Sequence, residues 1–451
     1  MDAFVIEGGR PLRGTVEVNG SKNAALPLMA ASLLTEDPVA LAGAPDLSDI
    51  RNMVRLLEAL GVEVSREQAA GGSSLRMSPK DPGLTTAPYE IVRTMRAGVC
   101  VLGPLLARRG RAKVSMPGGC AIGDRPVDLH IRGLRALGAE IELEGGYIVA
   151  QAPVDGSGNA RLRGARVFLG GPNGSTVLGT ANVMSAAALA EGETVIESAA
   201  CEPEIEDLAR LLNVMGAKVQ GAGTPRVTID GVESLSGAEH RVMPDRIEAG
   251  TYVLASAITN GDVALRRFPL DCMTAALDRL EQVGVRVTPV DDGLAEPDAV
   301  GGPCTVRVVS PRRLNPTHVV TQPHPGFPTD LQAQLMALLC LCDGNAIVTE
   351  KIFPDRFLHV PELLRMGANI TRVGASAMIS GVRELVGAPV MASDLRASAG
   401  LVLAGLAARG TTVINRVYHL DRGYQEMEKT LAALGASIRR MDQDKVPGDL
   451  R

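Results

Sequence analysis

The chain has 451 residues, 45% of them hydrophobic and 22% charged, a globular balance that excludes wholesale disorder. Aromatic residues make up 2% and the formal net charge is −5, which argues against base-stacking nucleic-acid folds and nonspecific nucleic-acid binding. No stretch approaches the roughly 20 apolar residues that span a bilayer, and the N-terminus lacks the pattern of a secretory signal, so we expect a cytoplasmic protein with free thiols.

One pattern recurs six times along the chain: an apolar helical run, a glycine, and then a β-branched strand. The first copy is Leu57–Val64, and the glycines stand at positions 61, 138, 216, 284, 367 and 435. Each glycine matches the position just after a helix, where the chain turns into a strand. We therefore predict six units of about 75 residues each.

A second turn precedes each of these glycines by about 25 residues. The six turns stand at Asp37, Gly110, Gly192, Gly261, Gly344 and Gly410. Each follows a helix of small residues and precedes a β-branched strand, such as Thr194-Val195-Ile196. Each unit thus contains two helices, each followed by a strand, with further strands in the remainder. Units of this size favour an α/β fold over a solenoid, and two domains of three units each, although the periodicity alone leaves that grouping open.

The first loop with candidate chemistry is Gly20–Pro27, which brings Lys22 and Asn23 to the start of a helix of small residues. Two interpretations remain open for this segment. Lys22 either forms part of an anion clamp at the helix start, or it is a solvated lysine beside Asn23 as the N-cap.

The second loop is Met116–His130, whose glycines and prolines are typical of an exposed segment. Cys120 precedes Arg125 there, and a nearby cation favours the reactive thiolate. Alternatively, Cys120 is a small buried hydrophobic residue, which is our interpretation of the cysteines in apolar segments, Cys100, Cys340, Cys342 and Cys272. Cys201 and Cys304 fall in turn-like segments, so a loop position alone does not single out Cys120.

The third loop, His324–Gln332, delivers Thr329 and Asp330 to the start of a helix. Asp330 either caps that helix or acts as a general base near a substrate hydroxyl.

The fourth set consists of three segments in which an arginine stands beside an acidic residue: Asp355-Arg356, Asp394 to Arg396, and Asp421-Arg422. Taken one at a time, these are typical of surface ion pairs. Together with Lys22, Arg96 and Arg125, they are also the residue types that bind phosphate and carboxylate. The sequence does not show whether they converge.

Taken in chain order, these motifs resemble those of the UDP-N-acetylglucosamine enolpyruvyl transferases. The segments that carry the resemblance span nearly the whole chain and are Gly20–Pro27, Thr94–Ala97, Pro117–His130, Glu202–Ile205, Pro244–Glu248, His324–Gln334, Arg356–Leu363, Asp394–Ser398 and Asp421–Tyr424. The Pro-Gly-Gly-Cys loop separates this family from the enolpyruvylshikimate-phosphate synthases, which share the fold.

The resemblance implies an α/β fold of two inside-out α/β barrel domains built from six βαβαββ repeats, with helices buried under outward-facing sheets. It assigns residues 21–243, which carry the cysteine loop, to one domain. Residues 1–20 plus 244–440 form the other, and 441–451 remain as a polar tail. It implies a monomer without metal or organic cofactor, and without nucleic-acid or membrane partners.

The implied reaction moves the enolpyruvyl group of phosphoenolpyruvate to the 3′-hydroxyl of UDP-N-acetylglucosamine and releases phosphate, through a tetrahedral ketal, as the first step of peptidoglycan precursor synthesis. The resemblance makes Cys120 the proton donor and Asp330 the base. It assigns the phosphate to Lys22, Arg125 and Arg422, and the carboxylate to Arg356 and Arg396. The implied sugar-nucleotide contacts are Asn23, Arg96, Arg125, Pro126, Val127, Asp128, Leu129, Thr176, Val177 and Ile352.

Two segments depart from the family pattern. In the loop 170–180, Gly174, Thr176 and Leu178 replace the family's Lys, Ser and Gly, which leaves the diphosphate contacts of this loop open. Two alternatives are therefore kept: an enolpyruvyl transferase with another sugar-nucleotide acceptor, and a non-catalytic paralogue that binds sugar nucleotide. Asp124 replaces a small residue, and we expect its carboxylate to raise the pKa of Cys120, which suits an acid better than a nucleophile.

Overall fold

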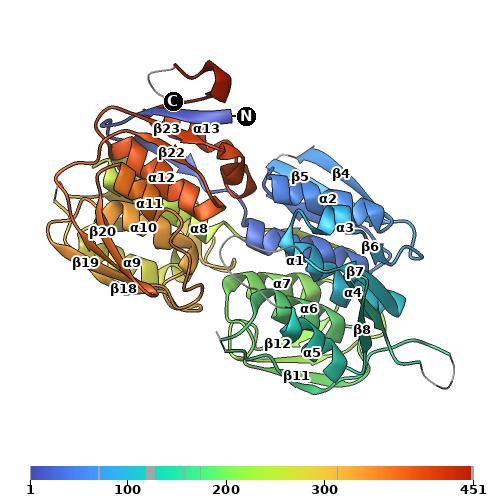
Figure 1. The fold of residues 1–451 in the computed structure, drawn as a ribbon. Helices are drawn as coiled ribbons and strands as arrows, with labels where there is room; N and C mark the ends of the chain where they lie inside the picture. The colour runs from blue at the N-terminus through green and yellow to red at the C-terminus, as the bar shows by residue number, and fades with distance from the viewer. Residues whose placement is uncertain are drawn as a thin grey trace. The chain divides into compact units, whose positions relative to one another are not determined.

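The computed structural model describes residues 2–69, 72–117, 127–154, 156, 158–172, 174–311 and 313–447. Within them the chain divides into two compact units, one formed by residues 2–19 and 244–447 and the other by residues 20–117 and 127–243 (Figure 1). Each unit contains three four-stranded sheets. The prediction of six α/β units is confirmed.

The unit of residues 20–243 is built in chain order from strands and helices that alternate as predicted. Its strands are β3 (Val39–Ala42), β4 (Val62–Ala69), β5 (Gly72–Pro79), β6 (Thr86–Ala87), β7 (Arg111–Ser115), β8 (Glu140–Glu144), β9 (Tyr147–Gln151), β10 (Arg166–Phe168), β11 (Glu193–Glu197), β12 (Lys218–Gln220), β13 (Arg226–Asp230) and β14 (Ala238–Arg241). Its helices are α1 (Lys22–Ala31), η1 (Ser32–Leu34), α2 (Ser48–Ala59), α3 (Tyr89–Val92), η2 (Arg96–Val101), α4 (Leu102–Arg109), α5 (Asp128–Ala136), α6 (Val177–Ala187) and α7 (Pro203–Val214).

The other unit repeats this arrangement and also takes in the N-terminal strands. Its strands are β1 (Asp2–Glu7), β2 (Arg13–Glu17), β15 (Asp262–Pro269), β16 (Arg286–Val290), β17 (Pro303–Val309), β18 (His318–Val320), β19 (Asn345–Thr349), β20 (Asn369–Val373), β21 (Ser376–Ser380), β22 (Pro389–Met391), β23 (Thr411–Asn415) and β24 (Ser437–Asp442). Its helices are α8 (Arg246–Ile258), η3 (Leu270–Cys272), α9 (Thr274–Val283), η4 (Thr329–Leu331), α10 (Gln332–Leu339), α11 (Val360–Arg365), α12 (Leu395–Ala407), η5 (Val417–Arg422), α13 (Met427–Ala433) and η6 (Gln443–Lys445).

All six sheets share one topology: a parallel edge pair followed by two antiparallel pairings. Three sheets are completed by strands from distant parts of the chain. Strand β14 pairs with β3, β2 pairs with β15, and β1 lies between β23 and β24. These pairings close each unit on itself.

The six predicted glycine turns have φ angles from 80° to 105°, a left-handed conformation that residues with a Cβ rarely adopt. The glycines therefore act as the helix ends that the pattern predicted.

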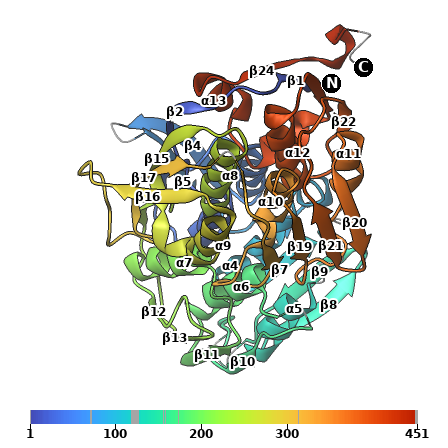
Figure 2. The ribbon, with the colours of Figure 1, turned by 90° about the vertical axis from the view of Figure 1, so that its left-hand side faces the viewer.

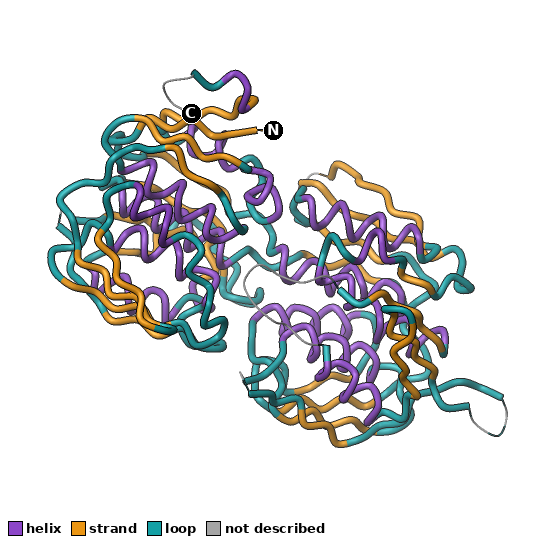
Figure 3. Tube along the Cα trace, in the orientation of Figure 1, coloured by secondary structure: helices purple, strands orange, loops and turns teal. Residues whose placement is uncertain are grey.

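Five helices, α1, α6, α8, α10 and α12, are buried almost along their whole length. Helices α8, α10 and α12 lie side by side, and the strands of each unit lie outside its helices (Figures 2 and 3). A Cβ on Gly400 of α12 would lie 2.8 Å from the carbonyl oxygen of Ala333 in α10. Such close contacts require small side chains, which explains the core poor in aromatic residues.

The described part of the predicted polar tail, residues 441–447, joins the fold. Strand β24 runs to Asp442, where it pairs with Asp2 of β1. Val446 is buried in a small cluster with Ala3, Val5 and Val413. Within the described residues, no helix is long and apolar enough to cross a membrane.

Candidate active site

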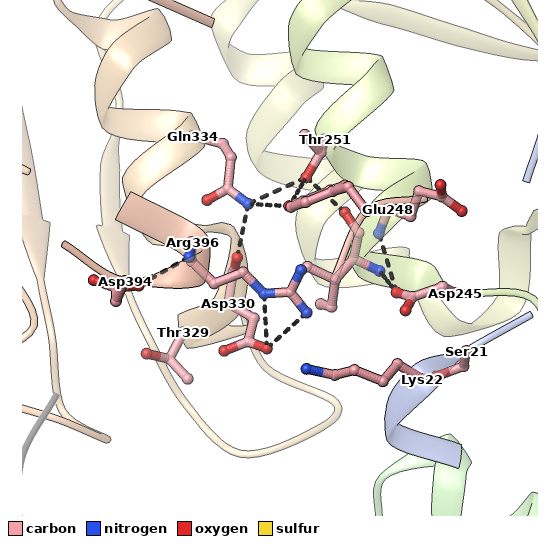
Figure 4. A network of polar contacts seen from close by, with 12 residues as sticks. Ser21, Lys22, Asp245, Glu248, Thr251, Thr329, Asp330, Gln334, Asp394 and Arg396 are labelled. Carbon is pink, nitrogen blue, oxygen red and sulfur yellow. Dashed lines mark hydrogen bonds and ion pairs between the residues drawn. The ribbon is translucent and has the colours of Figure 1, made fainter. Parts of the chain in front are cut away.

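Asp330 stands at the centre of an ion-pair cluster in the unit of residues 244–447. Its Oδ1 lies 2.7 Å from Nη1 of Arg356. Its Oδ2 lies 3.2 Å from Nε of Arg396, as Figure 4 shows. Both arginines are buried, Arg396 with 1% of its surface exposed. The cap positions of η4 and α10 are Pro328 and Leu331, so the alternative that Asp330 caps a helix is wrong.

Arg396 is placed by the start of α12. The Asp394 carboxylate caps this helix by accepting hydrogen bonds from the backbone N–H groups of Arg396 at 2.8 Å and Ala397 at 3.1 Å. Burial by itself would lower the pKa of Arg396, but Tyr424 and the carboxylates of Asp330 and Asp245 outweigh burial and raise it. The guanidinium is therefore charged. Both guanidinium groups are of the type that binds a carboxylate in bidentate fashion.

A buried hydrogen-bonded cluster supports this site from the helices. Gln334 of α10 donates from Nε2 to the Asp330 carbonyl at 2.9 Å, to Thr251 Oγ1 at 3.1 Å and to Tyr424 OH at 3.2 Å. The Thr251 and Tyr424 hydroxyls lie 2.9 Å apart, and the Arg396 guanidinium lies 5.4 Å from the Tyr424 ring centre. The Asp330 carbonyl is thus held by Gln334, whose amide is fixed by one hydroxyl on α8 and one in the segment between η5 and α13.

The acidic neighbours of the predicted arginines point elsewhere. Asp355 forms an exposed pair with Arg372 at 2.7 Å, and Asp421 pairs with Arg440. Arg422 lies half-buried in η5, where it adds to the effect of burial in lowering the pKa of His419. Adjacency in the sequence was therefore a poor guide to pairing, because Arg356 and Arg396 meet on Asp330 instead.

Lys22 lies in the other unit as the first residue of α1. Its Nζ is 3.2 Å from Asp49 Oδ2, and both side chains are buried. Ser21 is the N-cap, accepting from the Ala24 N–H at 3.3 Å. The alternative of a solvated lysine beside Asn23 as the N-cap is wrong. Asn23 is half-buried on the same helix.

The segment that follows the cysteine loop is anchored by His130 of α5. Its Nδ1 lies 2.8 Å from Asn182 Nδ2, and the same amide group donates to the Val99 carbonyl at 2.8 Å. Burial, helped by the charge of Arg96, lowers the pKa of His130 to about 4. A neutral imidazole thus accepts from Asn182. The predicted contacts Val127, Asp128 and Leu129 stand at the start of α5, buried, exposed and half-buried in turn.

The altered loop 170–180 keeps a helix cap. Thr176 caps α6, its hydroxyl accepting from the Gly179 N–H at 3.2 Å. Gly171 and Gly174 exchange backbone hydrogen bonds of 2.8 and 3.1 Å. Thr176 and Val177 are half-buried. These two glycine N–H groups bind within the loop.

Burial makes five of the described cysteines poor nucleophiles. Burial raises the pKa of both Cys100 and Cys340 to about 12, and it also raises the pKa of Cys201, Cys304 and Cys342. Burial was correctly predicted for Cys100, Cys340 and Cys342, but Cys272 is half-exposed. Cys120, Asp124, Arg125 and Pro126 lie outside the described residues.

Sequence reasoning assigned no role to Thr251, Gln334 or Tyr424. Thr251 and Gln334 are polar residues in two fully buried helices whose other residues are mostly small or aliphatic. Because a buried polar side chain needs a partner, this contrast was the signal available in the sequence. The identity of the partners was not readable there.

The chain is similar to known proteins along nearly its whole length. The family described as EPSP synthase (3-phosphoshikimate 1-carboxyvinyltransferase) matches residues 6–431. A UDP-N-acetylglucosamine 1-carboxyvinyltransferase of Rhodospirillum centenum is 53% identical over 451 residues, covering 98% of this chain and 99% of that one. The protein of the same description from Coxiella burnetii is 49% identical, covering 98% and 96%.

Two solved structures share the fold. The enolpyruvyl transferase NikO from Streptomyces tendae superposes with a TM-score of 0.84 at 24% identity, covering 98% of this chain and 99% of that one. An EPSP synthase from Acinetobacter baumannii gives a TM-score of 0.75 at 19% identity, covering 98% and 100%. The architecture of six sheets is thus that of the enolpyruvyl transferases.

Proposed function

The chain belongs to the family of EPSP synthase (3-phosphoshikimate 1-carboxyvinyltransferase), and from that premise we propose that it transfers the enolpyruvyl group of phosphoenolpyruvate to the 3′-hydroxyl of UDP-N-acetylglucosamine. Phosphate is released, and the product enters peptidoglycan precursor synthesis. The observation that carries the choice of acceptor is the match of about half of all residues, along nearly the whole chain, to relatives with that described activity. The proposal includes a monomeric, cytoplasmic enzyme that needs no cofactor.

The chemistry requires an acid, a base and cations. The acceptor oxygen adds to C2 of phosphoenolpyruvate while C3 takes up a proton, giving a tetrahedral ketal; loss of phosphate and of a C3 proton then restores the double bond. In the proposal, Cys120 donates the proton to C3 and Asp330 accepts the hydroxyl proton. The half-buried carboxylate of Asp330, held on both oxygens by arginines, supports this placement.

The cations are proposed to divide the charges of phosphoenolpyruvate between them. Arg356 and Arg396 bind its carboxylate, and Lys22, Arg125 and Arg422 bind its phosphate. A guanidinium has five N–H donors in a planar fork, so an arginine that contacts Asp330 also has the capacity to bind a substrate carboxylate. The sugar nucleotide is proposed to contact Asn23, Arg96, Arg125, Pro126, Val127, Asp128, Leu129, Thr176, Val177 and Ile352.

Phosphate release from phosphoenolpyruvate tests this function, measured with and without UDP-N-acetylglucosamine. We expect release only when the acceptor is present. Release with a different sugar nucleotide alone would favour another acceptor, and binding of UDP-N-acetylglucosamine without release would indicate a non-catalytic paralogue. Cys120→Ala is expected to abolish turnover, whereas Cys201→Ala, which removes a half-buried thiol, should retain it; undiminished turnover in Cys120→Ala would remove the acid role.

A further inference from the structure

A buried carboxylate is linked to the Asp330 cluster through Thr329. Glu350 follows β19 directly and has 0% of its surface exposed. It accepts four hydrogen bonds: from Thr321 Oγ1 at 2.7 Å, from Thr329 Oγ1 at 2.8 Å, and from the N–H groups of Ile352 at 2.8 Å and Phe353 at 3.0 Å.

The direction in which each threonine hydroxyl donates its proton follows from the N–H group that it accepts from. The Lys351 N–H donates to Thr321 Oγ1 at 2.9 Å, and Arg356 Nη1 donates to Thr329 Oγ1 at 3.0 Å. Because each hydroxyl accepts from nitrogen, its own proton is directed to Glu350. Glu350 therefore accepts on both oxygens.

The two oxygens of Glu350 serve different parts of the site. Oε2 accepts from Thr329, whose hydroxyl binds the same Arg356 Nη1 that binds Asp330. Oε1 accepts from Thr321 and from the backbone of Ile352 and Phe353. The backbone N–H of Arg356 also donates to the Phe353 carbonyl at 2.8 Å. The turn of residues 351–353 is therefore hydrogen-bonded to the backbone of this arginine.

We propose that Glu350 is a positioning residue of the enolpyruvyl transfer: through Thr329 it orients Arg356 and Asp330 for phosphoenolpyruvate, and through the 351–353 turn it places Ile352 for the sugar nucleotide. This inference rests on the proposed function. Burying a carboxylate is costly unless its oxygens are fully hydrogen-bonded. The Glu350 oxygen that accepts from Thr329 also polarises the Thr329 hydroxyl and strengthens the bond that this hydroxyl accepts from Arg356.

Steady-state kinetics of single variants separate the effect of Glu350 through Thr329 from its effect through the 351–353 turn. Thr329→Val removes the hydroxyl that links Glu350 to Arg356. It should lower kcat/KM for phosphoenolpyruvate by up to about 100-fold, with KM for UDP-N-acetylglucosamine unchanged within about twofold. Thr321→Val releases the turn and should raise KM for UDP-N-acetylglucosamine while KM for phosphoenolpyruvate stays constant. Glu350→Gln keeps the shape of the side chain but places an amide NH2 group against hydrogen-bond donors. It should change both kcat/KM for phosphoenolpyruvate and KM for UDP-N-acetylglucosamine.

Two variants serve as references. Thr329→Ser restores the hydroxyl and should recover most of the activity lost in Thr329→Val. Thr349→Val removes a neighbouring hydroxyl that bonds to Ser376 at 2.9 Å, and should leave both KM values near wild type. Circular dichroism and the unfolding midpoint show whether each variant is folded, and the threonine variants carry the test if Glu350→Gln does not fold.

Wild-type turnover separates the two possible failures. No phosphate release by the wild type would overturn the proposed function and this inference with it. Wild-type release together with near-normal kinetics of Glu350→Gln and Thr329→Val would overturn the inference alone. An equal loss of kcat in all variants, Thr349→Val included, without the split in KM would also overturn it, because it would show a purely structural role.

Discussion

Glu248 is a buried acid whose charge the fold disfavours. It lies on α8 with 2% of its surface exposed, and its carboxylate accepts from the N–H of Asn19 at 2.8 Å and from Asn19 Nδ2 at 3.0 Å. Burial, with the neighbouring Asp245 carboxylate, raises its pKa from 4.5 to about 7; the bonds from Asn19 and the charge of Arg396 oppose this only in part. Because Asn19 ends the first segment of its unit, the bond fixes a boundary of that unit.

The sign of the effect on stability follows from the raised pKa. Between pH 4.5 and pH 7 the folded chain holds a proton on Glu248 that the unfolded chain has lost, so the free energy of unfolding falls as the pH rises. The loss is about 3 kcal/mol between pH 4.5 and pH 8. Glu248→Gln does not titrate and escapes this loss. It gives up about 1 kcal/mol at every pH, because an amide has one acceptor oxygen for the two N–H donors of Asn19.

Equilibrium urea unfolding of the wild type and Glu248→Gln at pH 4.5 and pH 8 measures the difference directly. We expect the variant to be about 1 kcal/mol less stable at pH 4.5 and about 2 kcal/mol more stable at pH 8. Glu281→Gln, at an exposed position on α9, should differ from the wild type by the same amount at both pH values. The reasoning would be refuted if the difference in free energy of unfolding between the wild type and Glu248→Gln changed by less than about 0.5 kcal/mol from pH 4.5 to pH 8.

Three further predictions concern the packing and the chemistry. Gly103→Ala should lower the free energy of unfolding by about 1 to 3 kcal/mol, because its Cβ would lie 2.2 Å from the Asn182 carbonyl oxygen; thermal unfolding measures this, and Gly156→Ala, which meets no atom within 4 Å, should change little. Asp330→Asn should lower kcat about 10²- to 10⁴-fold in the phosphate assay, whereas Asp355→Asn, at an exposed ion pair, should not; a loss below twofold for Asp330→Asn would exclude it as the base. Asp124→Ala should lower the apparent pKa of iodoacetamide inactivation at Cys120, and identical pH profiles for wild type and variant would show that Asp124 has no such effect.

The sequence carried more of the fold than of the site. The periodic glycines at 61, 138, 216, 284, 367 and 435 predicted the helix ends because a left-handed turn is a local, chemical requirement. The burial of Cys100, Cys340 and Cys342 was predicted because each stands in an apolar run of the sequence. The partners of Asp330 were not, because Arg356 and Arg396 reach it from distant segments, while their adjacent acids, Asp355 and Asp394, are engaged with Arg372 and the start of α12.

By itself, the sequence determined six α/β units, an aliphatic core and the family whose motifs the loops carry, since each depends on residue types at short range. Tertiary structure alone decided which strand completes each sheet, with β14, β2 and β1 arriving from far along the chain. It also decided that Glu350 and Gln334 support Asp330. Hydrogen bonds form between atoms about 3 Å apart, and only folding brings residues of distant sequence to that distance.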